Sequence, residues 1–144
     1  MTLQDKDLTQ INPRWNLFAN SELLSAQATQ DILDAARCAI QEKGAFHIVL
    51  AGGTTPKYVY QQLALAKSDW QHWHIYIGDE RCLSVDNTDR NSVMAAEYLL
   101  DRVTIPKSQI HFIPAELGPV KAAAAYQETL STVEEFDMVL LGIG

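Results

Sequence analysis

The sequence predicts an α/β fold, a doubly wound and mostly parallel sheet with helices on both of its faces. Several runs of apolar, β-branched and aromatic residues are continuous rather than alternating, as expected of strands buried on both faces. Segments with apolar residues at helical spacing separate these runs. Because the two kinds of segment alternate along the chain, crossover helices are expected to join parallel strands.

The first half of the chain is expected to hold a short strand, a long helix, a buried strand and a second helix. Residues 15–20 have the composition of a short edge strand. Apolar residues at helical spacing begin after Ser21, an expected N-cap, and end before Gly44, a typical helix stop. The apolar run 46–51 predicts the buried strand, and residues 58–65 predict the helix after it.

The second half repeats this pattern. A buried strand is expected at 73–79, a loop without periodicity at 81–91, and a helix capped by Asn91 or Ser92. The last elements are a strand at 110–114, an Ala-rich helix at 121–135 and a strand at 136–144. Ligands of such sheets bind beyond the carboxyl ends of the strands. Function is therefore expected in the segments 51–56, 78–91 and 142–144.

Length and composition indicate one ordinary globular domain. Residues 1–14 are a polar lead-in, and residues 15–144 are expected to form the N-terminal portion of a single α/β domain. The net charge of −7 argues against nucleic acid as a partner. The lead-in lacks the apolar region of a signal peptide, and no apolar stretch approaches the roughly 20 residues of a membrane span. Cys38 and Cys82 lack metal-site spacing and are interpreted as reduced thiols of a cytoplasmic protein.

The loop AGGTTP follows the first buried strand and has the composition of an anion site. Gly52 and Gly53 would let a ligand approach the backbone. Thr54 or Thr55 could cap the next helix, and Pro56 suits its first position. The unpaired N–H groups and the dipole of such a helix favour a phosphate. A tight, well-capped turn without a ligand is the alternative.

A charged cluster, GDER, follows the next buried strand. Asp79 could orient a sugar hydroxyl or assist proton transfer, and Arg81 could hold a phosphate or stabilise developing negative charge. Glu80 lies between these two residues, and the loop that follows adds Asp86, Asn87, Asp89, Arg90 and Asn91. A solvated charged turn is the alternative, but a glycine loop at a neighbouring strand end favours a joint site.

Together these motifs resemble the 6-phosphogluconolactonase family, within the wider group that includes glucosamine-6-phosphate deaminase/isomerase. The family pattern has [S/A]GG[S/T]TP, then a strand ending in DER, then a loop with Asp and Asn before a helix. The matching segments are AGGTTP (51–56), WHIYIGDER (73–81), RNSVMAAEYLL (90–100) and FDMVLLGIG (136–144). The resemblance extends from about Trp15 to Gly144.

The resemblance implies a Rossmann-like fold of the phosphosugar isomerase/lactonase type, incomplete at its C-terminus. It also implies hydrolysis of 6-phosphogluconolactone to 6-phosphogluconate in the oxidative pentose phosphate pathway, without a metal or an organic cofactor. Asp79 and Arg81 would line the reaction centre. The residues implied to bind the substrate or its phosphate are Gly52, Gly53, Thr54, Thr55, Asn91, Gly142 and Gly144.

Two other functions remain open at this point. A deaminase or isomerase acting on an amino sugar phosphate is the nearest, although the deaminases carry an aromatic residue where Arg81 stands. A phosphosugar-binding module without catalysis is the other. Neither a nucleic acid nor a membrane is expected as a partner.

The family pattern continues as G-x-G-x-D-G-H-x-A-S, of which this chain supplies only Gly142 to Gly144. The histidine expected to activate water lies in the part beyond, so the 144-residue chain alone is expected to have little or no lactonase activity. The four histidines present are interpreted as packed or surface residues. A homodimer or a missing C-terminal segment is expected to cover the exposed edge of the sheet.

Overall fold

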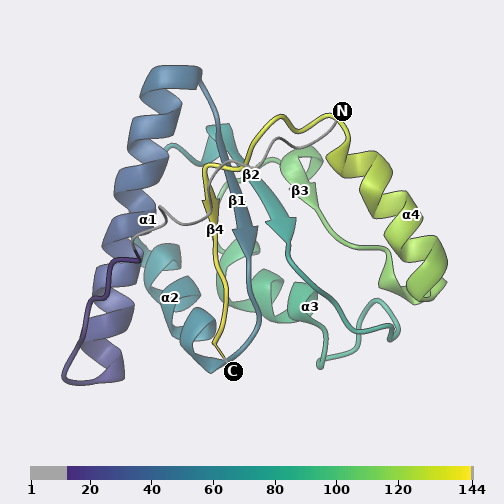
Figure 1. Ribbon diagram of the computed structural model, residues 1–144, viewed down its shortest axis with the longest axis horizontal. Coiled ribbons are helices and arrows are strands. Elements are labelled where there is room, and N and C mark those ends of the chain that lie inside the picture. Colours follow the sequence, from purple (N-terminus) through teal and green to yellow (C-terminus); the bar gives the residue numbers. More distant parts are fainter. Residues whose placement is uncertain (1–12, 144) are drawn as a thin grey trace.

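The computed structural model describes residues 13–143 and shows a parallel sheet between helices (Figure 1). The strands are β1 (Phe46–Leu50), β2 (Trp73–Ile77), β3 (Ile110–His111) and β4 (Met138–Val139). They lie in the order β3-β2-β1-β4, and every neighbouring pair is parallel. The predicted α/β class is therefore confirmed.

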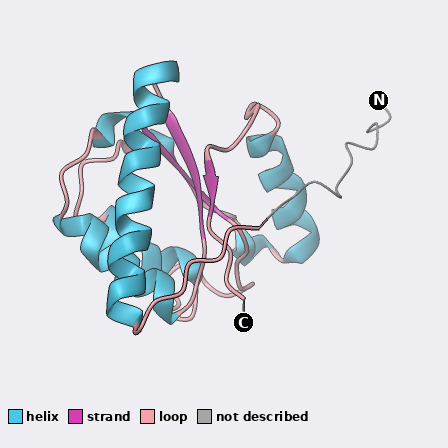
Figure 2. Cartoon of the chain, turned by 60° about the vertical axis from the view of Figure 1, so that its left-hand side comes forward, coloured by secondary structure: helices cyan, strands magenta, loops and turns pink. Residues whose placement is uncertain are grey.

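Helices cover both faces of the sheet. The main helices are α1 (Ser21–Lys43), α2 (Thr54–Leu65), α3 (Asn91–Ala95) and α4 (Pro119–Leu130). A π-helical turn, η3 (Ala96–Leu100), continues α3, and short 3-10 turns are η2 (Trp70–His72), η4 (Lys107–Gln109) and η5 (Ala115–Leu117). In Figures 1 and 2, α1 and α2 lie on one side of the sheet and α4 on the other. Within residues 13–143, no helix is both long and apolar enough to cross a membrane.

The strand order places a topological switch point at β1. From β1 the chain moves outward through β2 to β3, and then returns to pair β4 with the other edge of β1. The connections that leave β1 and β4 therefore diverge at their carboxyl ends. In doubly wound sheets, ligands bind in the crevice that this divergence opens.

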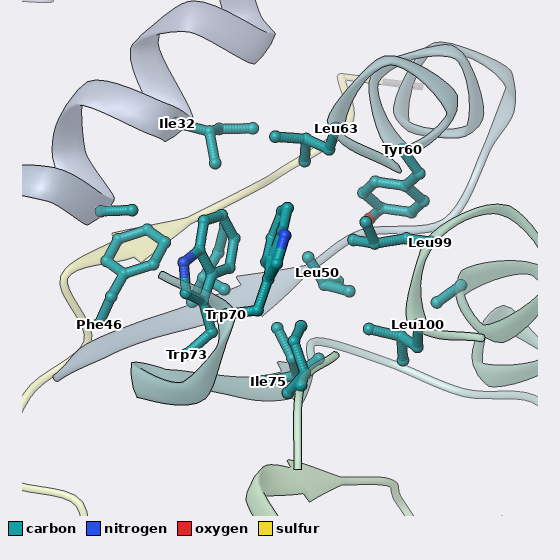
Figure 3. Close-up of a cluster of buried hydrophobic side chains, with 14 of the residues drawn as sticks. Ile32, Phe46, Leu50, Tyr60, Leu63, Trp70, Trp73, Ile75, Leu99 and Leu100 are labelled. Carbon is teal, nitrogen blue, oxygen red and sulfur yellow. The ribbon is translucent and has the colours of Figure 1, made fainter. Parts of the chain in front are cut away.

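The core lies between the sheet and the helices α1, α2 and α3 (Figure 3). Phe46 of β1 meets Trp73 of β2 edge to face, with ring centroids 4.8 Å apart. Tyr60 of α2 is fully buried there, and its hydroxyl donates a 2.6 Å hydrogen bond to the carbonyl oxygen of Ala51. This bond fixes α2 against the residue that follows β1, so the core also positions the glycine loop.

Two expectations for the N-terminal part are wrong. Residues 15–20 form no strand, and the exposed fractions of Trp15 and Leu17 are 77% and 91%. The N-cap of α1 is Asn20 rather than Ser21, because the Asn20 side chain accepts a 2.9 Å hydrogen bond from the Leu23 N–H. The predicted stop is confirmed, since Gly44 adopts φ 80° and its N–H bonds to Ile40.

The third and fourth strands are shorter than the expected 110–114 and 136–144. Each pairs with one neighbour only and through two residue pairs. Beyond β4, the Leu140 N–H still donates a 2.9 Å hydrogen bond to the carbonyl oxygen of Val49. The outer edge of β4 carries no strand among the described residues, and Leu141 and Ile143 beyond it are 82% and 97% exposed. That a second copy or a further segment covers this edge stays a prediction.

The sheet face away from α1 and α2 carries a layer of stacked rings. His47, His74 and His111 come from three adjacent strands, and the His47 and His74 centroids lie 4.5 Å apart. Tyr76 stacks on His111 at 4.8 Å and meets Phe136 edge to face at 5.2 Å. These three histidines are thus packed residues, as the sequence predicts.

This layer is expected to make stability fall at mildly acidic pH. Burial lowers the pKa of His47, His74 and His111 below the ordinary value of 6.5, and the charge of a neighbouring histidine lowers it further for His74 and His111. The unfolded chain therefore takes up protons first as the pH falls below 6.5, which favours unfolding. The melting temperature should be constant from pH 8.5 to 7.5 and fall from pH 6.5 to 5. The fall should be smaller for His74→Gln, and an equal fall would contradict the assignment.

Candidate functional site

A cleft of about 770 Å³ opens at the carboxyl ends of β1, β2 and β4. It lies at the switch point of the sheet, where a ligand is expected. Its walls are formed by Leu50, Ala51, Gly52, Gly53, Thr54, Thr55, Pro56, Gly78, Asp79, Arg81, Asn91, Leu140, Leu141, Gly142 and Ile143. Every site residue predicted from the sequence lines this cleft, apart from Gly144, which lies outside the described residues.

The glycine loop presents the N-terminus of α2 to the cleft. Gly53 is the N-cap, with φ 108° and ψ 175°, a conformation that favours glycine. No side chain caps this helix, so the expectation that Thr54 or Thr55 does so is wrong. Thr54 is instead the first helical residue, and Pro56 occupies the third position rather than the first. The exposed threonines and the positive end of the α2 dipole thus face the cleft.

Asn91 holds the two charged residues of the cleft. Its side-chain amide nitrogen donates to the backbone carbonyl oxygen of Asp79 at 2.8 Å and to the Asp79 carboxylate at 3.3 Å. Its side-chain oxygen accepts a 2.6 Å hydrogen bond from Nη1 of Arg81. Asn91 is 6% exposed, whereas Asp79 and Arg81 are exposed to the cleft. The buried side-chain amide of Asn91 therefore fixes the relative positions of the Asp79 carboxylate and the Arg81 guanidinium.

Gly52 makes room for this amide. A Cβ added to Gly52 would lie 2.0 Å from Oδ1 of Asn91 and 2.6 Å from its Cγ. The sequence suggests that Gly52 lets a ligand approach the backbone, and that stays a prediction. The structure adds that Asn91 occupies the space into which a Cβ of this residue would point. Gly52 thus brings the glycine loop into contact with the residue that orients Asp79 and Arg81.

A family model described as glucosamine-6-phosphate isomerases/6-phosphogluconolactonase matches residues 19–144. The chain belongs to this family. The resemblance inferred from AGGTTP and GDER is therefore confirmed, and the matched region includes the whole cleft.

Curated relatives and solved structures of the family agree with this assignment. A 6-phosphogluconolactonase of a Nostoc species is 41% identical over 130 residues, which cover 84% of this chain and 54% of that protein. The crystal structure of 6-phosphogluconolactonase from Thermotoga maritima matches with a TM-score of 0.78 at 32% identity, over 83% of this chain and 56% of that one. The Trypanosoma brucei 6-phosphogluconolactonase matches with a TM-score of 0.83 at 26% identity, over 92% and 60%. The chain thus spans little more than half the length of these family members.

Two residues outside the cleft wall support it and were not among the predicted site residues. Glu80 and Arg90 form a buried ion pair, with side chains that are 1% and 2% exposed. The sequence predicts that Asn91 or Ser92 caps the helix, but Arg90 occupies the N-cap position and offers no side-chain cap. The backbone N–H groups of Asn91 and Ser92 donate to the Glu80 carboxylate instead. In the sequence, only the position of Glu80 between Asp79 and Arg81 indicated that it belongs to the site.

Proposed function

We propose that the cleft binds a phosphorylated sugar lactone, and that the protein carrying this chain hydrolyses 6-phospho-D-glucono-1,5-lactone to 6-phosphogluconate. This is a step of the oxidative pentose phosphate pathway. The observation that carries the proposal is that the N-terminus of α2, which no side chain caps, opens into the same cleft as Arg81. The Nostoc and Thermotoga maritima relatives are 6-phosphogluconolactonases, which supports the choice of lactone.

The phosphate would lie at the glycine–threonine loop. The residues proposed to bind it are Gly52 and Gly53, through the backbone, and Thr54 and Thr55, through backbone N–H groups and hydroxyls. A helix N-terminus favours a dianion through its dipole. Lys57 follows Pro56 in the first turn of α2, but its ammonium lies over the Tyr98 ring, 4.5 Å from the centroid. Backbone groups rather than this lysine would therefore hold the phosphate.

The lactone carbonyl would lie near Asp79 and Arg81. Water attacks the carbonyl carbon, the carbonyl oxygen becomes an oxyanion, and collapse of the intermediate breaks the ring C–O bond. A base takes the proton of the water, and the ring oxygen receives a proton as it leaves. The Arg81 guanidinium would balance the oxyanion, and Asp79 would orient a sugar hydroxyl or assist proton transfer. Asn91 would shape the pocket, and Gly142 and Gly144 would contribute to its far wall.

The proposed ligand can be tested by calorimetric titration of the protein. 6-Phosphogluconate should bind at least about tenfold more tightly than gluconate, because only the former offers a dianion to α2. Glucosamine-6-phosphate forms the third arm, since the matched family also includes isomerases of that sugar. Preferential binding of glucosamine-6-phosphate would favour the deaminase alternative. Absence of binding to either phosphate would exclude a phosphosugar site.

A cytoplasmic location is proposed with this function. Cys38 and Cys82 are unpaired thiols on the surface of the described chain, as is usual for proteins of a reducing compartment. Cell fractionation with a cytoplasmic marker would test it, and recovery outside that fraction would contradict it.

A further inference from the structure

Glu80 and Arg90 lie behind the cleft, and neither is among its lining residues. Nε of Arg90 and Oε2 of Glu80 are 3.4 Å apart, and both side chains are almost fully buried. Burying two charges costs free energy unless hydrogen bonds satisfy both groups. The other bonds of this pair therefore indicate what it does.

The Glu80 carboxylate joins the end of β2 to the first turn of α3. Oε1 accepts hydrogen bonds from the N–H groups of Arg81 at 2.9 Å and Asn91 at 2.7 Å, and Oε2 accepts one from the Ser92 N–H at 2.9 Å. Burial acts to raise the pKa of this carboxyl, but these N–H donors outweigh it and hold the pKa below its ordinary value. Glu80 is thus a charged cap that two segments of the chain share.

Arg90 holds the other end of the same loop. Nη1 donates to the carbonyl oxygen of Leu83 at 3.2 Å and to the Glu116 carboxylate at 3.1 Å. Nη2 donates to the carbonyl oxygen of Ile113 at 3.0 Å. The guanidinium therefore ties the loop after Arg81 to the segment that follows β3, so the loop is fixed from both sides.

We infer that Glu80, held by Arg90, is a positioning residue that acts on the cleft through Asn91. Glu80 fixes the backbone of Asn91, and the Asn91 amide then sets the Asp79 carboxylate and the Arg81 guanidinium. The bond from the Arg81 N–H to Glu80 holds only the backbone of Arg81, so the path to its guanidinium runs through Asn91. Glu80 itself does not line the cleft. The inference rests on the proposed function for its ligand, 6-phosphogluconate, but the mechanical chain from Glu80 to Arg81 stands on the contacts alone.

A double-mutant cycle tests this order of action. Glu80→Gln and Asn91→Ala should each weaken 6-phosphogluconate binding about tenfold, measured by calorimetry at a temperature where circular dichroism shows folded protein. The double variant should bind no more than about threefold more weakly than Asn91→Ala, because Glu80 acts through Asn91. Glu116→Gln is the matched control, since Glu116 also pairs with Arg90 but is not among the residues that line the cleft. It should bind like the parent protein.

Three results would overturn the inference. A folded Glu80→Gln protein could bind 6-phosphogluconate as tightly as the parent, or the affinity losses of the two single variants could multiply in the double variant. The third result is a loss of affinity in Glu116→Gln as large as that in Glu80→Gln. If Glu80→Gln does not fold, the same measurements are made on Glu80→Asp. Aspartate keeps the negative charge beside Arg90, but its shorter side chain does not extend as far toward the N–H groups of α3. If the parent protein binds no 6-phosphogluconate, the proposed function fails on its own. The inference is then decided by the NMR signals of the Asn91 side-chain amide, which Glu80→Gln should shift and Glu116→Gln should not.

Discussion

Replacing Gly52 with alanine is expected to weaken 6-phosphogluconate binding by tenfold or more. The new methyl group would lie 2.0 Å from Oδ1 of Asn91, far inside contact distance. Asn91 is buried and bonded to both Asp79 and Arg81, so it cannot turn aside without moving them. Overpacking of this kind costs about 1–3 kcal/mol of folding free energy, and moving Asn91 aside relieves it. That movement displaces Asp79 and Arg81 in the cleft, and each 1.4 kcal/mol of binding free energy lost is a factor of ten in affinity.

Gly142→Ala is the matched control for this experiment. Gly142 lines the same cleft, but a Cβ built there meets no atom within 4 Å. Calorimetry on both variants, with melting curves to confirm folding, separates displacement of Asn91 from a general effect of a methyl group in the cleft. Normal binding by a folded Gly52→Ala protein would show that the contact between Gly52 and Asn91 does not control the site.

The parts of the fold predicted best are those determined by local composition and burial on both faces. The strands at 46–50 and 73–77 are the two inner strands of the sheet, so both of their faces are covered. Burial on both faces gives each strand a short continuous apolar run, which is recognisable in the sequence. The strands that end at 111 and 139 each pair with a single neighbour, and the length of that pairing sets where they end. The sequence of a segment alone does not determine the length of this pairing. The composition of residues 15–20 would suit a strand equally well, but this segment pairs with none of the four strands.

The site shows the same division. Arg81 and the glycine loop could be placed together because parallel strands end at one edge of the sheet. The hydrogen bonds by which Glu80 caps the N–H groups of Asn91 and Ser92 could not be predicted from the sequence. These bonds join Glu80 to residues that lie 11 and 12 positions further along the chain, across an aperiodic loop. The contact between Gly52 and Asn91 could not be predicted for a similar reason, because a glycine in sequence does not reveal which side chain fills the space where its Cβ would be.

The 144-residue chain alone is expected to bind 6-phosphogluconate and to leave the lactone to open at close to its spontaneous rate. A positioned general base contributes about 10²–10⁴-fold to such a reaction. None of the histidines among residues 13–143 lines the cleft, and three of them stack on the sheet face. Lactone loss is followed against a buffer blank, and hydrolysis well above that blank would show that Asp79 suffices as the base.

Fusion to the family's remaining part should then create activity that depends on this cleft. The chain covers 54% of the Nostoc 6-phosphogluconolactonase, and the family model matches it up to residue 144, so the remaining part of the Nostoc protein can be joined there. The fusion should hydrolyse the lactone, and Arg81→Ala within it should lower kcat by about 10²–10³-fold, the usual cost of losing an oxyanion donor. Because Arg81 comes only from this chain, its loss distinguishes catalysis in the described cleft from catalysis by the added segment. A fusion equally active with Arg81→Ala would mean that the guanidinium beside Asn91 takes no part in the reaction.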